Sequence, residues 1–290
     1  MKEFDYAAPV NLTDAAVLLA QYGARALAGG TDIIVQIREN RRDAGLVVDL
    51  KNVAELNVLS FDAKKGLILG AAVPCYRVAE HPEIRKHYPG LVDAISIIGG
   101  VQIQSRASVG GNLCNASPAA DSIPALIALV ASAVIATASG KRETVPVENF
   151  CTGPGRSILG PGAVLVHLHL PPPAPNSGSA YLRFIPRNEM DIAVVGVGVA
   201  LTLNDKRTAC VSARIALGAV APTPLFVPEA GAALAGSPLA DADIERAAAL
   251  AQAAAKPISD MRGSADYRKH LVGVLVKRAL RIAIERAKGG

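Results

Sequence analysis

Two glycine-rich segments are the part of this sequence best suited to hold a phosphate group. They are Ala28-Gly29-Gly30-Thr31-Asp32 and Ser108-Val109-Gly110-Gly111-Asn112. A nucleotide pyrophosphate needs several backbone N–H groups at close range, and glycine permits both positive φ angles and close approach. Thr31, Ser108 and Asn112 add side-chain donors for phosphate oxygens. The pattern predicts nucleotide-binding loops. Ordinary turns remain the alternative, because a chain with 26 glycines among 290 residues also forms Gly-Gly pairs by chance.

A carboxylate follows ten residues after Gly111 of the second segment. Asp121 stands at the start of an expected helix, where it either accepts a hydrogen bond from a ribose hydroxyl or caps the helix. Two common nucleotide fingerprints are missing from the sequence. The Gly196-Val197-Gly198 stretch lacks the third glycine of a dinucleotide-binding turn and sits inside an apolar strand, and no G-x-x-x-x-G-K-[ST] occurs. A nucleotide is therefore expected to be held in another way.

Hydrolytic and metal chemistry find little support in the sequence. It has no G-x-S-x-G nucleophile elbow and no H-E-x-x-H motif. His167 and His169 share one face of an expected strand, but without an evident third ligand they are interpreted as plain strand residues. The cysteines contain no C-x-x-C pair, which argues against a zinc site, a cluster ligated wholly by this chain and a disulfide framework. With no catalytic residue and no metal ligand assigned, the pattern is typical of a cofactor carrier.

Composition narrows the class of protein. A chain with 51% apolar residues can bury a large core, and its length suggests two domains. The net charge of +5 is spread along the chain and only 4% of residues are aromatic, which argues against a stacking surface for nucleic acid and suits an anionic cofactor. The longest apolar stretch, residues 123–138, is shorter than the ~20 residues of a membrane span. We expect a cytoplasmic protein without a secretion signal or membrane span.

Periodicity and turn residues outline the elements. The N-terminal half is expected to contain a helix opened by Thr13, strands at 24–28, 46–50 and 67–71, and helices at 89–98 and 121–131. The proline-rich run 171–178 predicts the main boundary, so that residues 1–175 form one domain with lobes of about 1–57 and 58–175. Residues 176–290 form the other. Within it we expect paired strands at 193–203 and 209–220 and helices at 241–255 and 267–288.

Several blocks match a known family in chain order. They are Arg25-Ala26-Leu27-Ala28-Gly29-Gly30-Thr31-Asp32-Ile33, the stretch Ser108 to Asp121, Arg187-Asn188-Glu189-Met190-Asp191-Ile192-Ala193, and Ser259-Asp260-Met261-Arg262-Gly263-Ser264-Ala265-Asp266-Tyr267-Arg268. The chain resembles, essentially from end to end, the FAD-binding subunit of molybdenum hydroxylases. This family includes the medium subunit of carbon monoxide dehydrogenase and the flavin part of xanthine dehydrogenase.

The resemblance implies an α+β fold: a PCMH-type (vanillyl-alcohol-oxidase-like) two-lobed FAD-binding domain followed by an α+β C-terminal domain. By position, the two glycine segments wrap the FAD pyrophosphate and Asp121 holds a ribose hydroxyl. Ile98, Leu165 and Arg183 contact the flavin, and FAD is bound non-covalently. The implied cofactor-binding residues are Arg25, Ala26, Leu27, Ala28, Gly29, Gly30, Thr31, Asp32, Ile98, Ser108, Val109, Gly110, Gly111, Asn112, Ser117, Asp121, Leu165 and Arg183.

The resemblance also implies partners. Electrons from a molybdopterin centre in a large subunit pass through two [2Fe-2S] clusters in a small subunit to FAD here, and then to NAD⁺, oxygen or a quinone-type acceptor. A dimer of heterotrimers is one assembly consistent with this. Where the family commonly carries Arg-Asn-Arg, this chain has Gln104-Ser105-Arg106, so a role for the first basic residue stays open. The alternatives are a stand-alone flavoprotein oxidase of the same superfamily and a non-catalytic nucleotide-binding scaffold.

Overall fold

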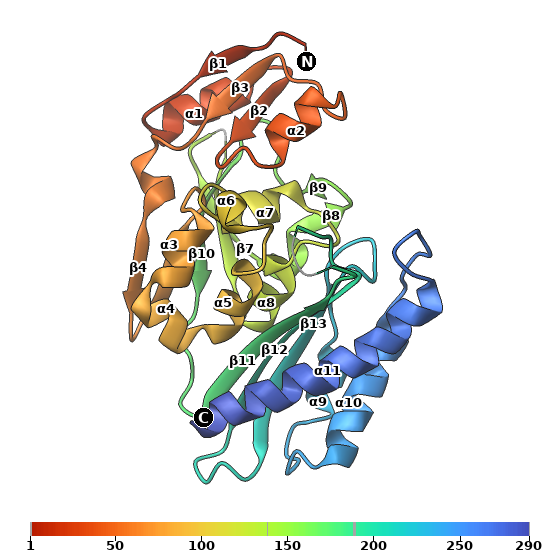
Figure 1. Ribbon diagram of the computed structural model, residues 1–290. Coiled ribbons are helices and arrows are strands. Elements are labelled where there is room, and N and C mark those ends of the chain that lie inside the picture. The colour runs from red at the N-terminus through yellow and green to blue at the C-terminus, as the bar shows by residue number, and fades with distance from the viewer. Residues whose placement is uncertain (1, 138, 188–189, 290) are drawn as a thin grey trace.

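The chain runs through three main sheets in turn, as Figure 1 shows for a computed structural model that describes residues 2–137, 139–187 and 190–289. Helices and strands are mixed throughout, which confirms the expected α+β class. Among the described residues, no helix combines the length and apolar character needed to cross a bilayer. In Figure 1 the N-terminal sheet lies at the top and the C-terminal sheet at the bottom.

The N-terminal sheet is parallel, with strand order β1-β3-β2. Its elements are β1 (Asp5–Ala7), α1 (Leu12–Leu19), β2 (Ala24–Leu27), α2 (Ile33–Arg38) and β3 (Leu46–Asp49). Both faces of β3 are buried, as is usual for a parallel strand covered by its connecting helices. Val47 packs with Leu27 and Ile37 on the side of α2, while Val48 joins the main core together with Ala15 of α1. Adjacent residues of β3 are therefore both apolar because each faces a different buried layer. Helix α2 begins directly after the first glycine segment.

The middle sheet is antiparallel, with strand order β4-β5-β10-β6-β7. Its strands are β4 (Leu59–Asp62), β5 (Gly66–Gly70), β6 (Ser132–Ala136), β7 (Arg142–Pro146) and β10 (Val164–Leu170). Leu168 and Leu170 are fully buried in the main core, whereas His167 and His169, which alternate with them, are only half-buried. The two histidines share a face, as predicted, and His169 Nε2 hydrogen-bonds to the Lys65 carbonyl at 2.7 Å.

Six helices pack with this sheet around the main core. They are α3 (Cys75–Glu80), α4 (Pro82–His87), α5 (Pro89–Ile95), α6 (Val101–Gln104), α7 (Val109–Asn115) and α8 (Ser122–Ala128). Short pieces complete this part: 3-10 turns at Ala54–Asn57 and Val147–Asn149, and the strand pair β8 (Cys151–Gly153) and β9 (Arg156–Ser157). The sequence indicated α5 and α8 but not α3, α4 or α6, whose helical pattern is too short to stand out.

The second glycine segment differs from the prediction. The sequence predicted a loop at 108–112, but helix α7 begins at Val109, and the Ser108 hydroxyl caps it by accepting from Gly111 N at 3.0 Å. Two glycines in a first turn disfavour a helix by intrinsic propensity. Burial outweighs that cost here, because Val109 and Leu113 are completely enclosed in the core.

The C-terminal sheet has strand order β11-β12-β13-β14 and a layer of helices on one face. Its elements are β11 (Ser177–Phe184), β12 (Val195–Leu203), β13 (Cys210–Gly218), β14 (Leu225–Phe226), α9 (Pro228–Ala232), α10 (Asp241–Ala254) and α11 (Ala265–Lys288). The predicted pairing of β12 with β13 and the two predicted long helices are confirmed. Figure 1 shows α11 running along β11 and β12.

The middle and C-terminal sheets share packed helices. Helix α8 packs on β12 and β13, and Gly198 of β12 lies so close to the Pro124 carbonyl that no side chain would fit there. Arg286 of α11 forms two hydrogen bonds, of 2.6 and 3.0 Å, with the Asp93 carboxylate of α5. Residues 171–176 lie between β10 and β11, and the division predicted at residue 175 stays a prediction.

Candidate cofactor site

A cavity of ≈ 1340 Å³ lies between the N-terminal sheet and the helices of the middle part, and both glycine segments line it. The segment between β2 and α2 forms one wall, and the start of α7 forms another. Residues 159–163 before β10 and residues 190–192 before β12 complete the lining. This volume exceeds the ~300–1,000 Å³ of drug-sized ligand sites. The cavity is therefore large enough for a dinucleotide.

The two glycine segments meet at the cavity. Arg106 Nε donates to the Gly29 carbonyl at 3.2 Å, and a side chain on Gly29 would collide with the Arg106 carbonyl. A Cβ on Gly110 would lie 2.5 Å from the carbonyl oxygen of Ala71. Close backbone packing thus explains both glycines. Positive φ was predicted for both segments, but within them the structure has it only at Gly30, with φ 78°.

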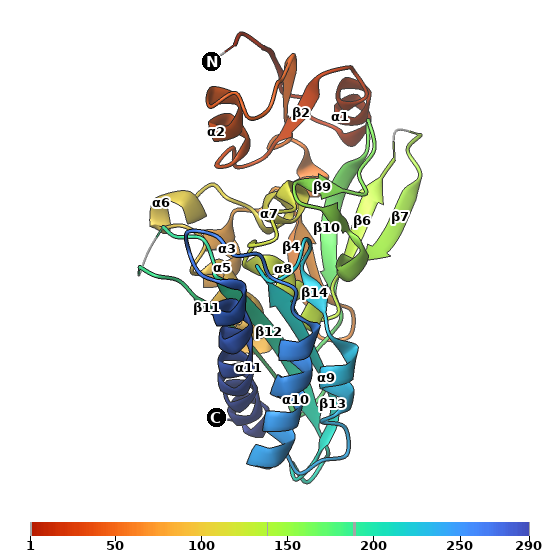
Figure 2. The same ribbon diagram turned by 90° about the vertical axis from the view of Figure 1, so that its right-hand side faces the viewer.

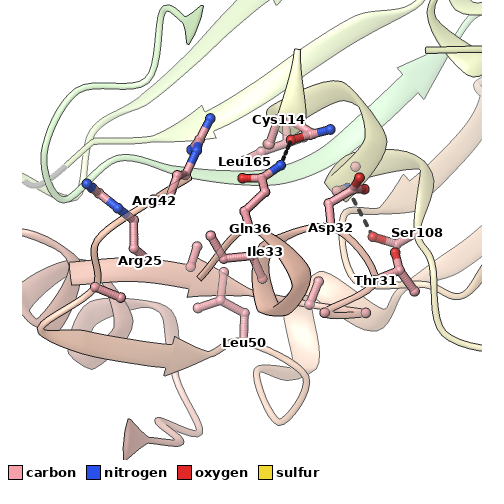
Figure 3. A pocket seen from close by; sticks show the side chains of 18 of the residues that line it. Arg25, Thr31, Asp32, Ile33, Gln36, Arg42, Leu50, Ser108, Cys114 and Leu165 are labelled. Atoms are coloured by element: carbon pink, nitrogen blue, oxygen red, sulfur yellow. Dashed lines mark hydrogen bonds between the residues drawn. The ribbon is translucent and has the colours of Figure 1, made fainter. Parts of the chain in front are cut away.

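Hydrogen-bond donors gather at one end of this cavity, where Figure 3 shows Thr31, Asp32 and Ser108 close together. Ser108 Oγ accepts from Gly111 N, so its O–H proton can still be donated to a ligand. Ser122 Oγ donates to Asn112 Oδ1 at 2.6 Å, which leaves the Asn112 amide NH₂ as the group that can donate. Three neutral donors from two separate segments therefore line the same cavity, which suits a phosphate group.

Cations lie toward the other end, where Figure 3 shows Arg25 and Arg42. Arg25 Nε donates to the Asp43 carbonyl and Arg42 Nη2 to the Gly155 carbonyl, each at 3.1 Å. Between the two ends, Gln36 Nε2 donates to Asn115 Oδ1 at 3.0 Å and joins α2 to α7. The guanidinium groups hydrogen-bond to neutral carbonyls, although the carboxylates of Asp43 and Asp32, which also line the cavity, lie close enough to Arg25 and Arg42 to offset part of their positive charge.

The cavity also has an apolar lining, with Leu50 and Leu165 on different sides of it in Figure 3. It consists of Leu50, Leu56, Ile98, Ile103 and Leu165. Cys114 also lines the cavity, and burial raises the pKa of its thiol to about 12. The thiol is thus protonated at neutral pH and a poor nucleophile. The combination of hydroxyl and amide donors, two arginines and an apolar lining fits FAD, which carries a charged pyrophosphate between flat ring systems.

Most of the sequence-predicted residues line this cavity. These are Arg25, Ala26, Ala28, Gly29, Gly30, Thr31, Asp32, Ile98, Ser108, Gly110, Gly111, Asn112 and Leu165. Five others lie outside its lining: Leu27, Val109, Ser117, Asp121 and Arg183. Leu27 and Val109 are buried in the core behind it. The direct FAD contacts expected for all eighteen stay predictions. In the block 187–193, residues Asn188 and Glu189 lie outside the described residues.

Asp121 and Arg183 contact each other instead of the cavity. Arg183 Nη1 donates to Asp121 Oδ2 at 2.7 Å, and the Tyr181 hydroxyl donates to Oδ1 at 2.8 Å. The side chains of Arg183 and Asp121 are only 5% and 10% exposed. Asp121 occupies the N-cap position of α8 without accepting a capping bond. Burial raises the pKa of this carboxyl, and the Arg183 charge opposes the rise.

Several lining residues were not foreseen. Gln36 lies on a helix and Arg42 on a turn after the first segment. Polar residues are common at such positions, so their types alone did not indicate a role in the site. The residues 159–163, Leu-Gly-Pro-Gly-Ala, did carry a signal, because a glycine-proline-glycine turn directly before a strand fixes a tight backbone. Asp191 and Ile192 belong to a block quoted above for its family resemblance, but nothing in their residue types placed them beside the glycine segments.

Comparison with known proteins settles the family. Residues 2–173 match the model of the FAD binding domain in molybdopterin dehydrogenase, and residues 180–283 match the CO dehydrogenase flavoprotein C-terminal domain. This chain belongs to that FAD-binding family. It is a flavoprotein subunit of an oxidoreductase, and the matched models account for both its FAD-binding part and its C-terminal part.

Relatives in this FAD-binding family cover nearly the whole chain. The putative xanthine dehydrogenase FAD-binding subunit of Escherichia coli K12 is 32% identical, over 99% of each chain. The carbon monoxide dehydrogenase medium chain of Afipia carboxidovorans is 31% identical, over 98% of each chain. Among solved structures, carbon monoxide dehydrogenase from Hydrogenophaga pseudoflava superposes with a TM-score of 0.93 at 30% identity, over 98% of each chain. Quinoline 2-oxidoreductase from Pseudomonas putida 86 gives 0.90 at 30%, over 99% of each chain.

Proposed function

We propose that this chain holds FAD in the cavity between its two glycine segments and serves as the electron-output subunit of a heteromeric molybdenum-containing hydroxylase. The observation that carries the proposal is that Thr31, Ser108 and Asn112 from both glycine segments line one dinucleotide-sized cavity in a chain of this family. FAD supplies a ring that accepts electrons singly and releases them in pairs. The rest of the function falls to the protein: binding, orientation and exclusion of water.

The donors would hold the pyrophosphate. Hydrogen bonds from neutral donors to an ionised phosphate are charge-assisted, and each contributes about 1.5–3 kcal/mol. Arg25 and Arg42 would add long-range attraction for the same charge. Because Thr31 directly precedes α2, Ser108 caps α7 and Asn112 lies in α7, these helices fix the positions of the donors before the ligand arrives. Such preorganisation lowers the entropic cost of binding.

The apolar lining would receive the flat ring. Leu56 is almost completely buried, Ile98 lies between α5 and α6, and Leu165 lies on β10. An apolar environment excludes water and strengthens any electrostatic interaction in the site. Neither glycine segment contains a histidine or a cysteine, and the nearby Cys114 stays protonated, so we propose that FAD is held without a covalent bond.

Partners complete the proposal. Relatives of this chain are named as the medium chain or the FAD-binding subunit of dehydrogenases, which supports a role inside a larger complex. We place two [2Fe-2S] clusters in a small partner subunit and a molybdopterin centre in a large one, with an assembly such as a dimer of heterotrimers. NAD⁺, oxygen or a quinone-type compound would take the electrons. The cytoplasmic location stays a prediction.

Purification of the chain from its native cells tests the proposal. We expect a visible flavin spectrum with about one FAD per chain, together with iron and molybdenum in fixed proportion, and substrate oxidation only by the complex. The isolated, flavin-loaded chain should oxidise no organic substrate. A folded chain without flavin would refute the site. A flavin-loaded chain that turns over an organic substrate without iron or molybdenum would favour the stand-alone oxidase instead.

A further inference from the structure

A fully buried hydroxyl group lies directly behind one of the proposed phosphate donors. Ser122, the first residue of α8, is 0% exposed, and its Oγ donates to Asn112 Oδ1 at 2.6 Å. Asn112 lies on α7 and lines the cofactor cavity, whereas Ser122 lies outside the lining. Figure 2 shows α8 below α7, on the side away from the N-terminal sheet. Ser122 therefore acts on the cavity only through Asn112.

This hydrogen bond decides which end of the Asn112 carboxamide faces the cavity. Because the hydroxyl proton is donated to Oδ1, that oxygen is held toward α8, and the planar amide turns its nitrogen the other way. Among the described residues, Asn112 Nδ2 has no acceptor, and it is not one of the buried side-chain atoms left without a partner. Its N–H groups are thus open to a ligand. The opposite orientation would present a carbonyl oxygen, which repels a phosphate group.

The position of Ser122 is itself fixed. Every residue of α8 is buried, so this helix cannot shift without disturbing the core. Asp121, the residue before Ser122, accepts from Arg183 Nη1 at 2.7 Å and from the Tyr181 hydroxyl at 2.8 Å. These contacts hold the start of α8 in place. The Ser122 hydroxyl thus connects a rigid part of the core to a side chain of the cavity lining.

We propose that Ser122 is a positioning residue for the cofactor, which orients the Asn112 carboxamide so that its N–H groups meet the FAD pyrophosphate. The inference rests on the proposed function. Without the Ser122 hydroxyl, the Asn112 side chain of the apoprotein is free to turn both polar ends toward water in the cavity. Binding of FAD then forces Oδ1 back against the core, where it has no donor. A buried acceptor without a partner weakens binding.

The test compares Ser122→Ala with the matched control Ser179→Ala, each in the full chain purified from its native cells and then freed of flavin. Ser179 is also buried, with 4% exposure, but its hydroxyl accepts from Gly90 N at 3.0 Å and lies outside the lining of the cofactor cavity. Fluorescence titration measures FAD affinity. We expect Ser122→Ala to bind FAD about 5- to 150-fold more weakly, which corresponds to about 1–3 kcal/mol for one unpaired polar group. Ser179→Ala should bind FAD like wild type.

A double-mutant cycle shows the route of the effect. If Ser122 acts through Asn112, Ser122→Ala should cause no further loss of FAD affinity once Asn112 has been replaced by alanine. If Ser122 only stabilises the core, its replacement should weaken FAD binding by the same factor with and without the Asn112 side chain. The cycle therefore separates positioning of the amide from a structural effect.

A second variant, Asn112→Asp, leaves the core unchanged and decides the question even if Ser122→Ala does not fold. The Ser122 hydroxyl should hold one carboxylate oxygen and so turn the other toward the phosphate. We therefore expect Asn112→Asp to bind FAD more weakly than Asn112→Ala, because like charges repel.

The outcomes separate the role of Ser122 from the FAD site itself. Weaker FAD binding in Ser122→Ala, wild-type affinity in Ser179→Ala and no further loss in the Asn112→Ala background would support the inference. Affinity of Ser122→Ala within about 2-fold of wild type, an equal loss with and without the Asn112 side chain, or equal affinities of Asn112→Asp and Asn112→Ala would overturn it. The proposed FAD site would then still stand. A wild-type chain that carries no flavin would overturn both.

Discussion

A pair of substitutions at neighbouring glycines separates packing from cofactor binding. Gly110 faces the core: a Cβ there would lie 2.5 Å from Ala71 O and 2.6 Å from Ala71 Cα. Gly111 faces the cavity, where a Cβ would meet only Ser108 Oγ, at 3.0 Å. We expect Gly110→Ala to destabilise the apoprotein and Gly111→Ala to weaken FAD binding. The two residues are adjacent in α7, so propensity effects are the same for both.

The magnitudes follow from that geometry. Overpacking a core against backbone costs about 1–3 kcal/mol, and the contacts at Gly110 place it at the upper end. Alanine recovers up to about 1 kcal/mol of helix propensity, which leaves Gly110→Ala less stable by about 2 kcal/mol. In Gly111→Ala the same gain is opposed only by the 3.0 Å approach of the methyl group to Ser108 Oγ. If its methyl group displaces one charge-assisted hydrogen bond of about 1.5–3 kcal/mol, FAD binds about 10- to 150-fold more weakly.

Urea unfolding of both apoproteins and fluorescence titration with FAD measure these changes. A Gly110→Ala apoprotein as stable as wild type would refute the packing geometry. Unchanged FAD affinity in Gly111→Ala would show that the second segment does not face the cofactor. Gly110→Val is not a clean test of binding, because its larger side chain would meet the same Ala71 backbone and lose flavin through unfolding.

Three further outcomes are expected. Asp121→Ala should lower the apoprotein's unfolding free energy by about 3–5 kcal/mol because it leaves Arg183 buried without a partner; normal apoprotein stability with weaker FAD binding would instead support a direct ribose contact. The hydrogen bonds from Arg268 lower the pKa of Asp260, so the stability this carboxylate contributes is complete above its unfolded-state pKa and is lost as pH falls through the lower folded-state value. Thermal unfolding from pH 7 to 3 should therefore show an acid-induced fall in melting temperature that is smaller in Asp260→Asn. Acid precipitation should release the flavin into the supernatant, since Cys114 stays protonated, and colour retained in the pellet would speak for a covalent link.

Much of the fold could be predicted from the sequence, because in the long helices and strands the apolar residues repeat with one regular spacing. The helices at 241–254 and 265–288 keep an apolar stripe over several turns, and strands 195–203 and 210–218 flank a clear turn. The helix that starts at Val109 was missed because its stability comes from burial of Val109 and Leu113, which local composition does not reveal.

The glycine segments were found from residue type, yet the physical reason differs from the one that found them. Positive φ was expected, but Gly29 and Gly110 are required because another backbone passes close to them. A positive φ angle and a closely packed backbone both select glycine, so the sequence alone does not show which of the two applies. The partners, Arg106 and Ala71, are distant along the chain, and no local rule connects them to the glycines.

The Asp121 cluster shows where local reasoning ends and what the fold adds. An aspartate before a helix suggests a cap, but this one pairs with Arg183, 62 residues away on β11. Arg183 Nη1 also lies 3.5 Å from the carbonyl of Asp191, a residue that lines the cavity. Asp191 in turn stands three residues before Val194, whose carbonyl accepts from Arg268. Two buried arginines, Arg183 and Arg268, thus fix the two ends of the same short segment, so contacts made far from the glycine segments position part of the cavity lining.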